Sequence, residues 1–572
     1  MYDKLNRFEQ IVFDILSVFL LLFYSYSAVL QPAATQYHRG IFVIITYVLI
    51  FIAYKSKTLI FRILDYILVF LSTFSIGYWI LNFEVINYRT GAETDFDKAV
   101  AIIGVLIGIE LARRVVGNVF VFLGIILLAY GVYGDYMPEL ISHAGDTFPE
   151  LCTSIFYKSD GVFGIMANVL ATYVILFVLF GAFLEKSGAQ RFFIDFPLAA
   201  VGHRIGGPGK VAVIASGLFG SISGSAIANV VSTGTFTIPM MKKAGFKPHV
   251  AGGIEPAASI SGMFMPPIMG AGGFIMAELT GVPYSQIMLV AVFPALMYVF
   301  SVFMMVHYEA KIHDVRGEKS EFSAMHILKT EWFYIMPLVV ITVLMLYGYS
   351  PGYAAIIGTI SCLVVSWIKK ETRIGPKRFV EAARLGTLNS LTIGATVGVI
   401  GIIIGVLTFS GLVLTFADIV IQLAEGRLWL TIILIALASL VLGMGVPVTA
   451  AYLITAVVAV PALTHLGVNE IAAHMIVYWL SQDSNITPPV CIAAFAGATI
   501  AGANMWRTAF SSFKFAKFLY LGPFLFGYVP AFTLNGSAGD IVKVFIIIFF
   551  GTWLYSYLLS GIWVRQLKSK LK

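Results

Sequence analysis

Met265-Pro266-Pro267, near the middle of this 572-residue chain, has a counterpart in Thr487-Pro488-Pro489. The two proline pairs are 488 − 266 = 222 positions apart. The same offset aligns five further residues with identical ones and needs no gap: Pro239 with Pro461, Gly245 with Gly467, Thr233 with Thr455, Ser259 with Ser481 and Ala251 with Ala473. Such self-similarity indicates two copies of one structural unit. We place the two units at about 215–280 and 438–505.

Both units share one plan: a Gly-rich entry, an apolar arm, a short polar turn and a second arm broken by Pro-Pro. The entries read Gly220-Ser221-Ile222-Ser223-Gly224-Ser225 and Gly443-Met444-Gly445-Val446-Pro447-Val448-Thr449. Proline removes an amide donor and glycine relaxes the backbone, so we expect both arms to unwind part-way. Unwound backbone at membrane depth must line a cavity or be buried in protein. The units therefore predict two re-entrant hairpins. The alternative is that each unit is a pair of complete membrane helices, packed closely at glycines and kinked at prolines.

The whole chain has the composition of a membrane protein. Hydrophobic residues make up 59% and charged residues 12%, whereas soluble domains carry about 25% charged residues. The apolar runs lie at about 10–30, 41–54, 59–81, 99–133, 165–184, 285–307, 333–368, 388–443 and 513–565. With the broken segments between them they predict roughly fifteen to seventeen membrane elements. They lack the alternation of barrel strands, so the predicted fold class is all-α.

Basic residues indicate the orientation of the chain in the membrane. The connections 307–332 and 369–384 are rich in Lys and Arg, and between them two apolar runs are joined by Ser350-Pro351-Gly352. The chain therefore crosses twice and returns to one side, which the positive-inside rule assigns to the cytoplasm. The first apolar run continues through Leu30 and is interrupted by acidic residues. It favours a membrane helix over a cleaved signal peptide.

Several function classes find no support in the sequence. The pattern Gly206-Gly207-Pro208-Gly209-Lys210 is followed by Val211, so the nucleotide-binding motif is incomplete. The three cysteines are far apart and predict neither disulfides nor a thiolate metal site. The net charge of +7 sits in short clusters beside apolar runs, which points to membrane lipid and not to nucleic acid. No catalytic motif is present, so we expect no enzyme and no cofactor.

In transporter sequences, apolar segments that are interrupted at corresponding positions in the two halves of the chain indicate the binding site. Freed carbonyls can coordinate a cation, and exposed helix N-termini can hold an anion. The candidate substrate- and ion-binding residues are Ser223, Gly224, Ser225, Asn229, Glu255, Pro266, Pro267, Gly445, Thr449, Asp483, Ser484, Asn485, Thr487 and Pro488. Their oxygens are hard ligands that suit Na⁺, for which the candidate ligands are Ser223, Asn229, Gly445 and Asn485.

Glu255 and Asp483 are the strongest ionisable candidates, because ionisable side chains inside membrane segments are usually functional. Either carboxylate is suited to ligate a cation or to carry a proton. The alternative is that each caps a broken half-helix.

Three stretches identify a family resemblance: Gly220 to Gly234, Met265-Pro266-Pro267-Ile268-Met269-Gly270-Ala271, and Ser484-Asn485-Ile486-Thr487-Pro488-Pro489-Val490. They resemble fused permeases of tripartite ATP-independent periplasmic (TRAP) transporters, in the branch that works with TAXI-type binding proteins. Residues 151–572 resemble the large membrane subunit, and residues 1–150 resemble the small four-helix subunit. Met263 and Asn485 depart from the family pattern, where Gln and Asp are frequent.

The resemblance implies an importer in the bacterial inner membrane, with many crossings, that takes a small organic acid from a separate periplasmic binding protein. It also implies an elevator mechanism, in which a transport domain holding both hairpins slides against a helical scaffold. The expected substrates are dicarboxylates, 2-oxoglutarate and similar anions, and the expected assembly is one permease chain, with a dimer as the alternative. A stand-alone carboxylate carrier that needs no binding protein is the alternative function.

The membrane potential constrains the coupling ion. Moving one charge across 100 mV is worth about 2.3 kcal/mol, so importing a dianion against a negative interior costs about 4.6 kcal/mol. Two cations offset that electrical cost, and a third lets the potential drive uptake. We therefore expect Na⁺ coupling with at least two ions per dicarboxylate, and H⁺ coupling through Glu255 or Asp483 is the alternative.

Overall fold

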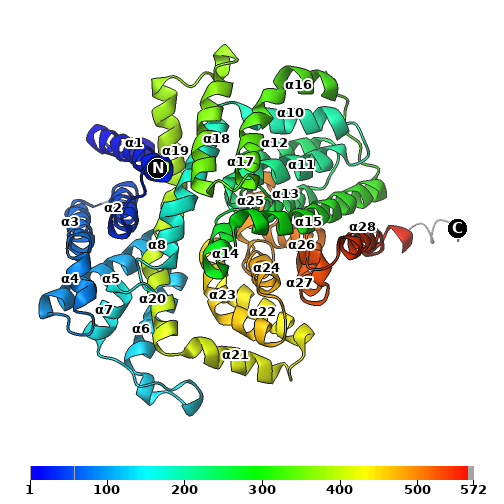
Figure 1. The fold of residues 1–572 in the computed structure, drawn as a ribbon. Coiled ribbons are helices and arrows are strands. Elements are labelled where there is room, and N and C mark those ends of the chain that lie inside the picture. Colours follow the sequence, from blue (N-terminus) through cyan, green and yellow to red (C-terminus); the bar gives the residue numbers. More distant parts are fainter. Residues whose placement is uncertain (1, 57, 321, 565–572) are drawn as a thin grey trace.

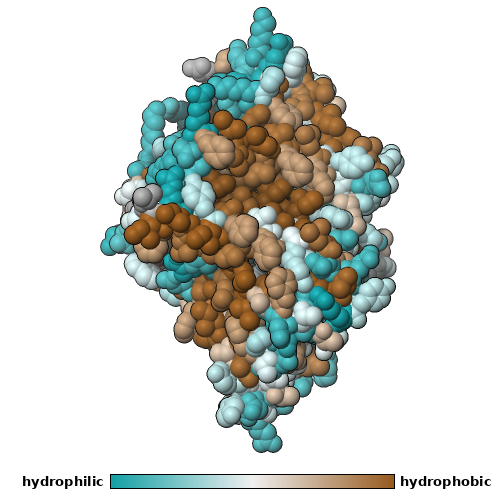
Figure 2. All heavy atoms as spheres, turned by 90° about the vertical axis from the view of Figure 1, so that its left-hand side faces the viewer, coloured by the Kyte–Doolittle hydropathy of each residue, from teal (hydrophilic) through white to brown (hydrophobic). Residues whose placement is uncertain are grey.

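The computed structural model describes residues 2–56, 58–320 and 322–564, with the side chains of all of these except Leu59 and Ser223. Among these residues the regular elements are helices and there is no strand. Nine of the described helices are long and apolar enough to cross a membrane, and five shorter apolar helices have 10–17 residues. Figure 2 shows apolar side chains as a broad band between hydrophilic ends. The protein is an all-α, multi-pass membrane protein, as the apolar runs predict.

The N-terminal segment, which we define as α1 to α7, forms a layer along one side of the molecule (blue to cyan in Figure 1). Its helices are α1 (Arg7–Val29), α2 (Thr35–Ala53), α3 (Leu59–Leu81), α4 (Phe83–Tyr88), α5 (Asp95–Val115), α6 (Asn118–Val132) and α7 (Phe148–Tyr157). A short 3₁₀ turn at Tyr2–Lys4 precedes α1, and the 3₁₀ turns Gly134–Tyr136 and Glu139–Ile141 lie between α6 and α7.

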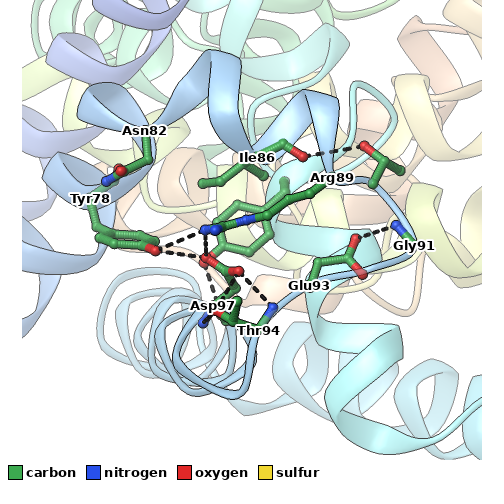
Figure 3. Close-up of polar contacts among 10 residues, drawn as sticks. Tyr78, Asn82, Ile86, Arg89, Gly91, Glu93, Thr94 and Asp97 are labelled. Atoms are coloured by element: carbon green, nitrogen blue, oxygen red, sulfur yellow. Dashed lines mark hydrogen bonds and ion pairs between the residues drawn. The ribbon is translucent and has the colours of Figure 1, made fainter.

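A buried carboxylate fixes the start of α5 (Figure 3). Asp97 Oδ1 accepts hydrogen bonds from Arg89 Nη2 at 2.6 Å and from Tyr78 OH at 2.7 Å. Its Oδ2 accepts from the backbone N of Thr94 at 2.8 Å and from the Thr94 hydroxyl at 2.7 Å. This capping box satisfies donors that the helix start leaves free. It ties the end of α3, the following loop and α5 into one unit.

Helices α8 (Ile165–Val169) and α9 (Ile175–Lys186), the π-helical turn Leu170–Val174 between them, and α17 to α20 form a group that we call the scaffold. The other members are α17 (Met336–Leu346), α18 (Pro351–Ser366), α19 (Pro376–Gly394) and α20 (Val397–Phe409). The turn between α17 and α18 is closed by Ser350, whose hydroxyl accepts from Tyr353 N at 3.2 Å. Two apolar helices thus flank Ser350-Pro351-Gly352, at the place where the sequence predicts two crossings.

The N-terminal segment packs directly on the scaffold. Arg384 on α19 donates from Nε and Nη2 to the two carboxylate oxygens of Asp14 on α1, at 2.6 and 2.8 Å. Helices α5 and α20 cross at Gly108 and Gly398, where a Cβ on Gly108 would lie 2.9 Å from the Gly398 Cα. Only glycine permits such a close backbone approach at this crossing.

The two repeat units lie beside the scaffold. The first unit contains α11 (Gly207–Ser223), α12 (Ala226–Lys243), α13 (Pro248–Phe264) and α14 (Gly272–Thr280). The second contains α22 (Leu428–Leu442), α23 (Val448–His465), α24 (Glu470–Leu480) and α25 (Ile492–Ala501). With the offset of 222, the starts of α12 and α13 coincide with those of α23 and α24.

The remaining helices connect and surround the units. They are α10 (Ala189–Val201), α15 (Tyr284–His313), α16 (Ala324–Glu331), α21 (Leu412–Leu423), α26 (Met505–Phe515), α27 (Phe518–Tyr528) and α28 (Ala538–Ser560), with short 3₁₀ turns at Trp332–Ile335, Lys370–Thr372, Asp483–Asn485 and Pro530–Thr533.

The two units enter from opposite ends of the molecule. Gly206, at the base of α11, donates its backbone N–H to Val315 O at 2.9 Å, so the first unit begins beside the basic connection 307–332. Figure 1 shows α11 and α12 in the upper part with α10 and α16, and α22 and α23 in the lower part with α21. The repeat is therefore inverted, with a hairpin from each end and a helical scaffold at its side.

The interruptions differ from the expectation in one respect. The hairpins are α11–α12 and α22–α23, with tips at Gly224 and at Gly443–Pro447, whereas the Pro-Pro pairs interrupt the following helices. Pro239 and Pro461 lie inside α12 and α23, which continue through them. A single proline removes one hydrogen bond, and these helices tolerate that loss at both positions.

Candidate functional site

The tips of both hairpins, the breaks in α13–α14 and α24–α25 and the facing scaffold helices enclose a cavity of about 760 Å³. Six of the fourteen candidate residues line it: Gly224, Ser225, Gly445, Thr449, Ser484 and Asn485. Gly224 and Gly445 both have positive φ angles, 61° and 72°. That left-handed conformation, which favours glycine, turns each hairpin at its tip.

The helix N-termini at the cavity are its most electropositive feature. Helix α12 starts at the Ser225 cap, where Ser225 Oγ accepts from Ala228 N at 3.3 Å, and α23 starts at Pro447. Ser225, Pro447 and their neighbours line the cavity. Among the described lining residues Glu185 is the single charged side chain, and none is Lys or Arg. Backbone N–H groups at the start of a helix attract an anion without a basic side chain.

Two tyrosines satisfy the backbone of the first Pro-Pro break. Tyr478, from the second unit, donates its hydroxyl to Met269 O at 2.5 Å and also contacts Met263 O. Tyr284 donates to Ile268 O at 2.5 Å and lies 2.8 Å from Pro267 O. Pro266 and Pro267, which are not among the cavity-lining residues, are thus held in a closed hydrogen-bonded turn. These tyrosines were not predicted, because neither lies in a polar cluster of the sequence.

The second Pro-Pro break, between α24 and α25, differs from the first in having buried polar side chains without partners. Gln482, Asp483 and Asn485 are all buried, and Gln482 Oε1, Asp483 Oδ1 and Asn485 Nδ2 have no hydrogen-bond partner in the described part of the protein. Thr487 contacts the hydroxyl of Tyr520 through Oγ1, and neither it nor Pro488 lines the cavity. Polar groups in low dielectric without partners are costly. This break therefore offers buried side-chain oxygens of Gln482 and Asp483 that have no partner in the described part of the protein.

Glu255 lies outside the cavity, inside the first unit. Its side chain is fully buried between α11, α12 and α13. Ser216 and Thr233 lie 2.5 Å from its Oε1, Ser259 lies 3.4 Å from the same oxygen, and Thr237 contacts Oε2. The carboxyl group is thus enclosed by hydroxyls and does not cap a half-helix end.

The candidate sodium ligands are not gathered at one point. Gly445 and Asn485 line the cavity, whereas Asn229 is fully buried inside the first unit and its Nδ2 donates to Ser216 O at 2.8 Å and contacts Ser259 O at 3.4 Å. The side chain of Ser223 lies outside the described residues. Among those residues no group of three or more His, Cys, Asp or Glu side chains is arranged to hold a metal ion.

The scaffold supplies one wall of the cavity, and no motif in the sequence predicted it. This wall includes Phe177 and Glu185 on α9 and Asn389 and Thr392 on α19. These residues belong to helices without a motif. The signal that could have found them is their polarity, because Asn389 and Thr392 lie within the apolar run 388–443 and Glu185 directly follows the run 165–184.

An aromatic cluster separates this cavity from a second one of about 550 Å³ between α14–α15 and α17–α18. Phe274 on α14 lines both cavities. Its ring stacks on Phe177 at 4.8 Å, on Tyr173 at 5.5 Å and on Tyr284 at 4.3 Å between centroids. Tyr173 belongs to the π-helical turn, a local form that is frequent at functional sites.

Comparisons with known proteins show similarity to transporter permeases. Residues 103–532 match the family model described as "Tripartite ATP-independent periplasmic transporter, DctM component". A putative TRAP transporter large permease protein of Haemophilus influenzae is 25% identical over 321 residues, which cover 55% of this chain and 74% of the relative. The C4-dicarboxylate TRAP transporter large permease protein DctM of Pseudomonas aeruginosa is 24% identical over 396 residues, covering 67% and 91%. The solved structure of the Alcanivorax borkumensis YdaH transporter aligns with a TM-score of 0.48 and 16% identity, over 73% of this chain and 98% of that one.

Proposed function

Because this chain belongs to the DctM component family of tripartite ATP-independent periplasmic transporters, we propose that it imports a small organic acid delivered by a separate periplasmic binding protein. The import is driven by a gradient of Na⁺ or H⁺. The substrate class is a dicarboxylate, 2-oxoglutarate or a similar anion. The family consists of transporters, so the protein acts by moving its substrate and not by converting it.

One observation carries this proposal: both inverted units present their hairpin tips to one cavity that has helix N-termini and no basic side chain among its described lining residues. A carboxylate held there by backbone N–H groups keeps most of its negative charge. Moving that charge inward against the membrane potential costs about 2.3 kcal/mol per charge at 100 mV. A co-transported cation offsets this cost, which explains why such a cavity needs ion coupling.

The location of the cavity supports an inward-facing state. Val115 of the N-terminal segment and Glu185 of the scaffold line it at the ends of α5 and α9, and Leu385 lines it from the middle of α19. Leu385 directly follows the basic stretch 369–384, which includes the first half of α19 and which the positive-inside rule assigns to the cytoplasm. The aromatic cluster around Phe274 then closes the cavity toward the periplasm. An elevator movement of the two units against the scaffold exposes the site to the other side.

The N-terminal segment is proposed to be the small membrane subunit, fused ahead of the large one. Residues 1–150 correspond to this subunit and residues 151–572 to the large subunit in our division. The Asp14–Arg384 ion pair and the glycine crossing of α5 and α20 support this division, because they join the segment to the scaffold and not to the repeat units. The proposed partner is a TAXI-type binding protein, and the proposed location is the bacterial inner membrane.

Uptake into proteoliposomes tests the function. The purified chain is reconstituted, and radiolabelled 2-oxoglutarate is offered with and without a TAXI-type binding protein, under separate Na⁺ and pH gradients. We expect accumulation only with the binding protein and one of the gradients. Uptake without any soluble partner favours the stand-alone carrier, and no gradient-driven uptake with any small organic acid contradicts the proposal.

A further inference from the structure

Glu185, on the last turn of α9, faces the cavity of about 760 Å³ between the hairpin tips and the scaffold. It is the single charged side chain among the described lining residues. Within the described structure its carboxylate has no hydrogen-bond or ion-pair partner. Lys186 follows it in the chain, but successive residues on a helix point about 100° apart, and Lys186 is not a lining residue. The cavity therefore contains a carboxylate without a cationic partner.

Two arginines that directly precede lining residues of α5 and α19 are paired elsewhere. Arg114 donates from Nε to a carboxylate oxygen of Glu110 at 2.6 Å. Arg384 donates from Nε to Asp14 at 2.6 Å. Neither arginine is a lining residue. A cation that pairs with Glu185 must therefore come from outside the described lining of the cavity.

Glu185 lies one helical turn from the tip of the first hairpin. Gly181, four residues earlier on α9, meets that tip closely, because a Cβ on Gly181 would lie 3.3 Å from Ile222 O. Side chains four residues apart on a helix share one face, with about 5–6 Å between their Cβ atoms. Gly224 and Ser225, which follow Ile222, form the tip and the cap of α12. An acidic side chain and a helix N-terminus thus face one cavity about one turn apart.

These two features together favour a ligand that carries opposite charges. The free N–H groups at the start of α12 attract a carboxylate. The Glu185 carboxylate attracts a cation and repels a second negative charge. A protonated amino group is the cation that a small organic acid can carry itself. The cavity therefore discriminates between an amino acid and an acid that has only negative charges.

Asn389 on α19 adds a neutral polar group to the same wall. Its side chain is exposed, lines the cavity and has no hydrogen-bond partner in the part of the chain that the structure describes. The amide can donate to a carboxylate or accept from an ammonium group. Gly386, one turn before it, brings α19 close to α9, since a Cβ there would lie 2.9 Å from the Leu179 Cα. Glu185 and Asn389 therefore belong to one tightly packed wall of the scaffold.

We propose that Glu185 pairs with a protonated amino group of the substrate, so that this permease carries an amino acid in preference to the keto or hydroxy acid of the same skeleton. This inference rests on the proposed function of an importer of small organic acids and narrows its substrate class. Because Glu185 belongs to the scaffold, it meets the substrate only in the inward-facing position and favours that position for a substrate with an amine. Such a substrate carries one negative charge fewer, so one coupling cation fewer offsets its electrical cost.

Equilibrium binding to the purified permease in lipid nanodiscs tests this preference without a binding protein or a gradient. The probes are L-glutamate and 2-oxoglutarate, which share one carbon skeleton and two carboxylates and differ in the amino group. At equal pH and Na⁺ we expect glutamate to bind wild type at least about tenfold more tightly. Glu185→Gln should reduce this ratio to about threefold or less, and Glu470→Gln, at an exposed residue of α24, should keep it. A wild-type ratio near one, or an unchanged ratio in Glu185→Gln, overturns the proposal.

Charged thiol reagents test the charge of the cavity without any substrate. Asn389→Cys places a thiol in the cavity, whereas the native Cys152, Cys362 and Cys491 are buried. The reagents are methanethiosulfonates that carry a trimethylammonium or a sulfonate group. We expect Glu185→Gln to lower the rate of the cationic reagent, relative to the anionic one, by about tenfold. An unchanged ratio of the two rates shows that Glu185 does not set the charge of the cavity and overturns the proposal.

Transport separates the failure of this inference from the failure of the proposed function. If wild type neither binds nor imports either acid, the proposed function fails for these probes, and the thiol rates still decide the role of Glu185. If wild type imports both acids and Glu185→Gln leaves their ratio unchanged, the inference fails and the importer function stands. If Glu185→Gln does not fold, Glu185→Ala replaces it, and Glu185→Asp, which keeps the charge, should keep the preference for glutamate.

Discussion

Asn168 of the scaffold donates its Nδ2 to Glu278 Oε1 of the first repeat unit at 2.8 Å. The same Asn168 accepts from Arg39 Nε of the N-terminal segment at 3.2 Å, so three parts of the protein meet at this point. Glu278 lies one turn after Phe274, on the same side of α14 as the aromatic cluster. The contact between Asn168 and Glu278 therefore lies beside the aromatic cluster that separates the two cavities.

If the units slide against the scaffold, this contact must break in every transport cycle. We expect the double variant Asn168→Cys/Glu278→Cys, treated with a bifunctional thiol reagent, to lose uptake by at least about tenfold. Reduction of a cleavable linker should restore it. The measurement is substrate uptake into proteoliposomes before and after cross-linking.

A matched control joins two positions that we expect to move together. Lys242 in the first unit donates to Ala501 O in the second at 2.7 Å. Cross-linked Lys242→Cys/Ala501→Cys should keep most of its uptake, because the link lies within the moving part. If both cross-linked pairs transport equally well, the repeat units do not slide against the scaffold.

Gly262 allows α13 to pack on α11 at backbone distance. A Cβ at this position would lie 2.2 Å from the carbonyl carbon of Gly220 and 2.3 Å from its Cα. Neither backbone atom can yield without moving α11, so we expect Gly262→Ala to destabilise the protein by about 1–3 kcal/mol. Thermal unfolding of the purified protein measures this change. Gly551→Ala, where a Cβ meets nothing within 4 Å, is the control, and equal melting temperatures for the two variants contradict the packing argument.

The sequence predicted the parts of the fold that depend on local pattern. The offset that aligns Pro266 with Pro488 located both units, whereas the glycine stretches around 224 and 445, which the sequence indicated as entries to the units, form the hairpin tips. Asn229 shows the limit: its polarity indicated a ligand, yet its amide holds α11 and α13 together. Residue type does not tell which way a side chain on a helix faces.

Contacts between distant segments could not be predicted from the same patterns. Tyr478 and Met269 are 209 positions apart, and Tyr284 lies outside the repeat as the sequence defined it. A tyrosine in an apolar helix has the same local signature whether it packs, faces lipid or satisfies a carbonyl. The scaffold wall of the cavity was missed for the same reason, since Asn389 and Thr392 become meaningful only when α19 is placed against the hairpins.

Removing the Tyr478 hydroxyl tests whether the first break depends on the second unit. Tyr478→Phe keeps the ring and leaves Met263 O and Met269 O without this donor. Unsatisfied buried carbonyls cost about 1–3 kcal/mol, so we expect a lower melting temperature and reduced uptake. Tyr26→Phe, at a half-exposed tyrosine whose hydroxyl contact with Gln31 is 3.5 Å, should leave both values near wild type. A Tyr478→Phe protein as stable as Tyr26→Phe would show that water or rearrangement satisfies these carbonyls.

The fused-subunit proposal predicts that the N-terminal segment stays attached when the chain is cut. The connection between α6 and α7 contains exposed residues such as Leu140, and such loops tolerate interruption. We expect two co-expressed pieces, divided after Glu139, to purify together, because α5 and α6 pack on α20.

Asp14→Arg places two positive charges together at Arg384 and should weaken the association of the two pieces. The charge-swapped variant Asp14→Arg/Arg384→Asp should recover it. Ion pairs in contact with solvent contribute about 1 kcal/mol or less, and this pair is partly buried, so the single variant should change the yield of the co-purified segment several-fold without abolishing it. Pieces that separate completely in the wild-type pairing contradict a permanent small-subunit role for the segment.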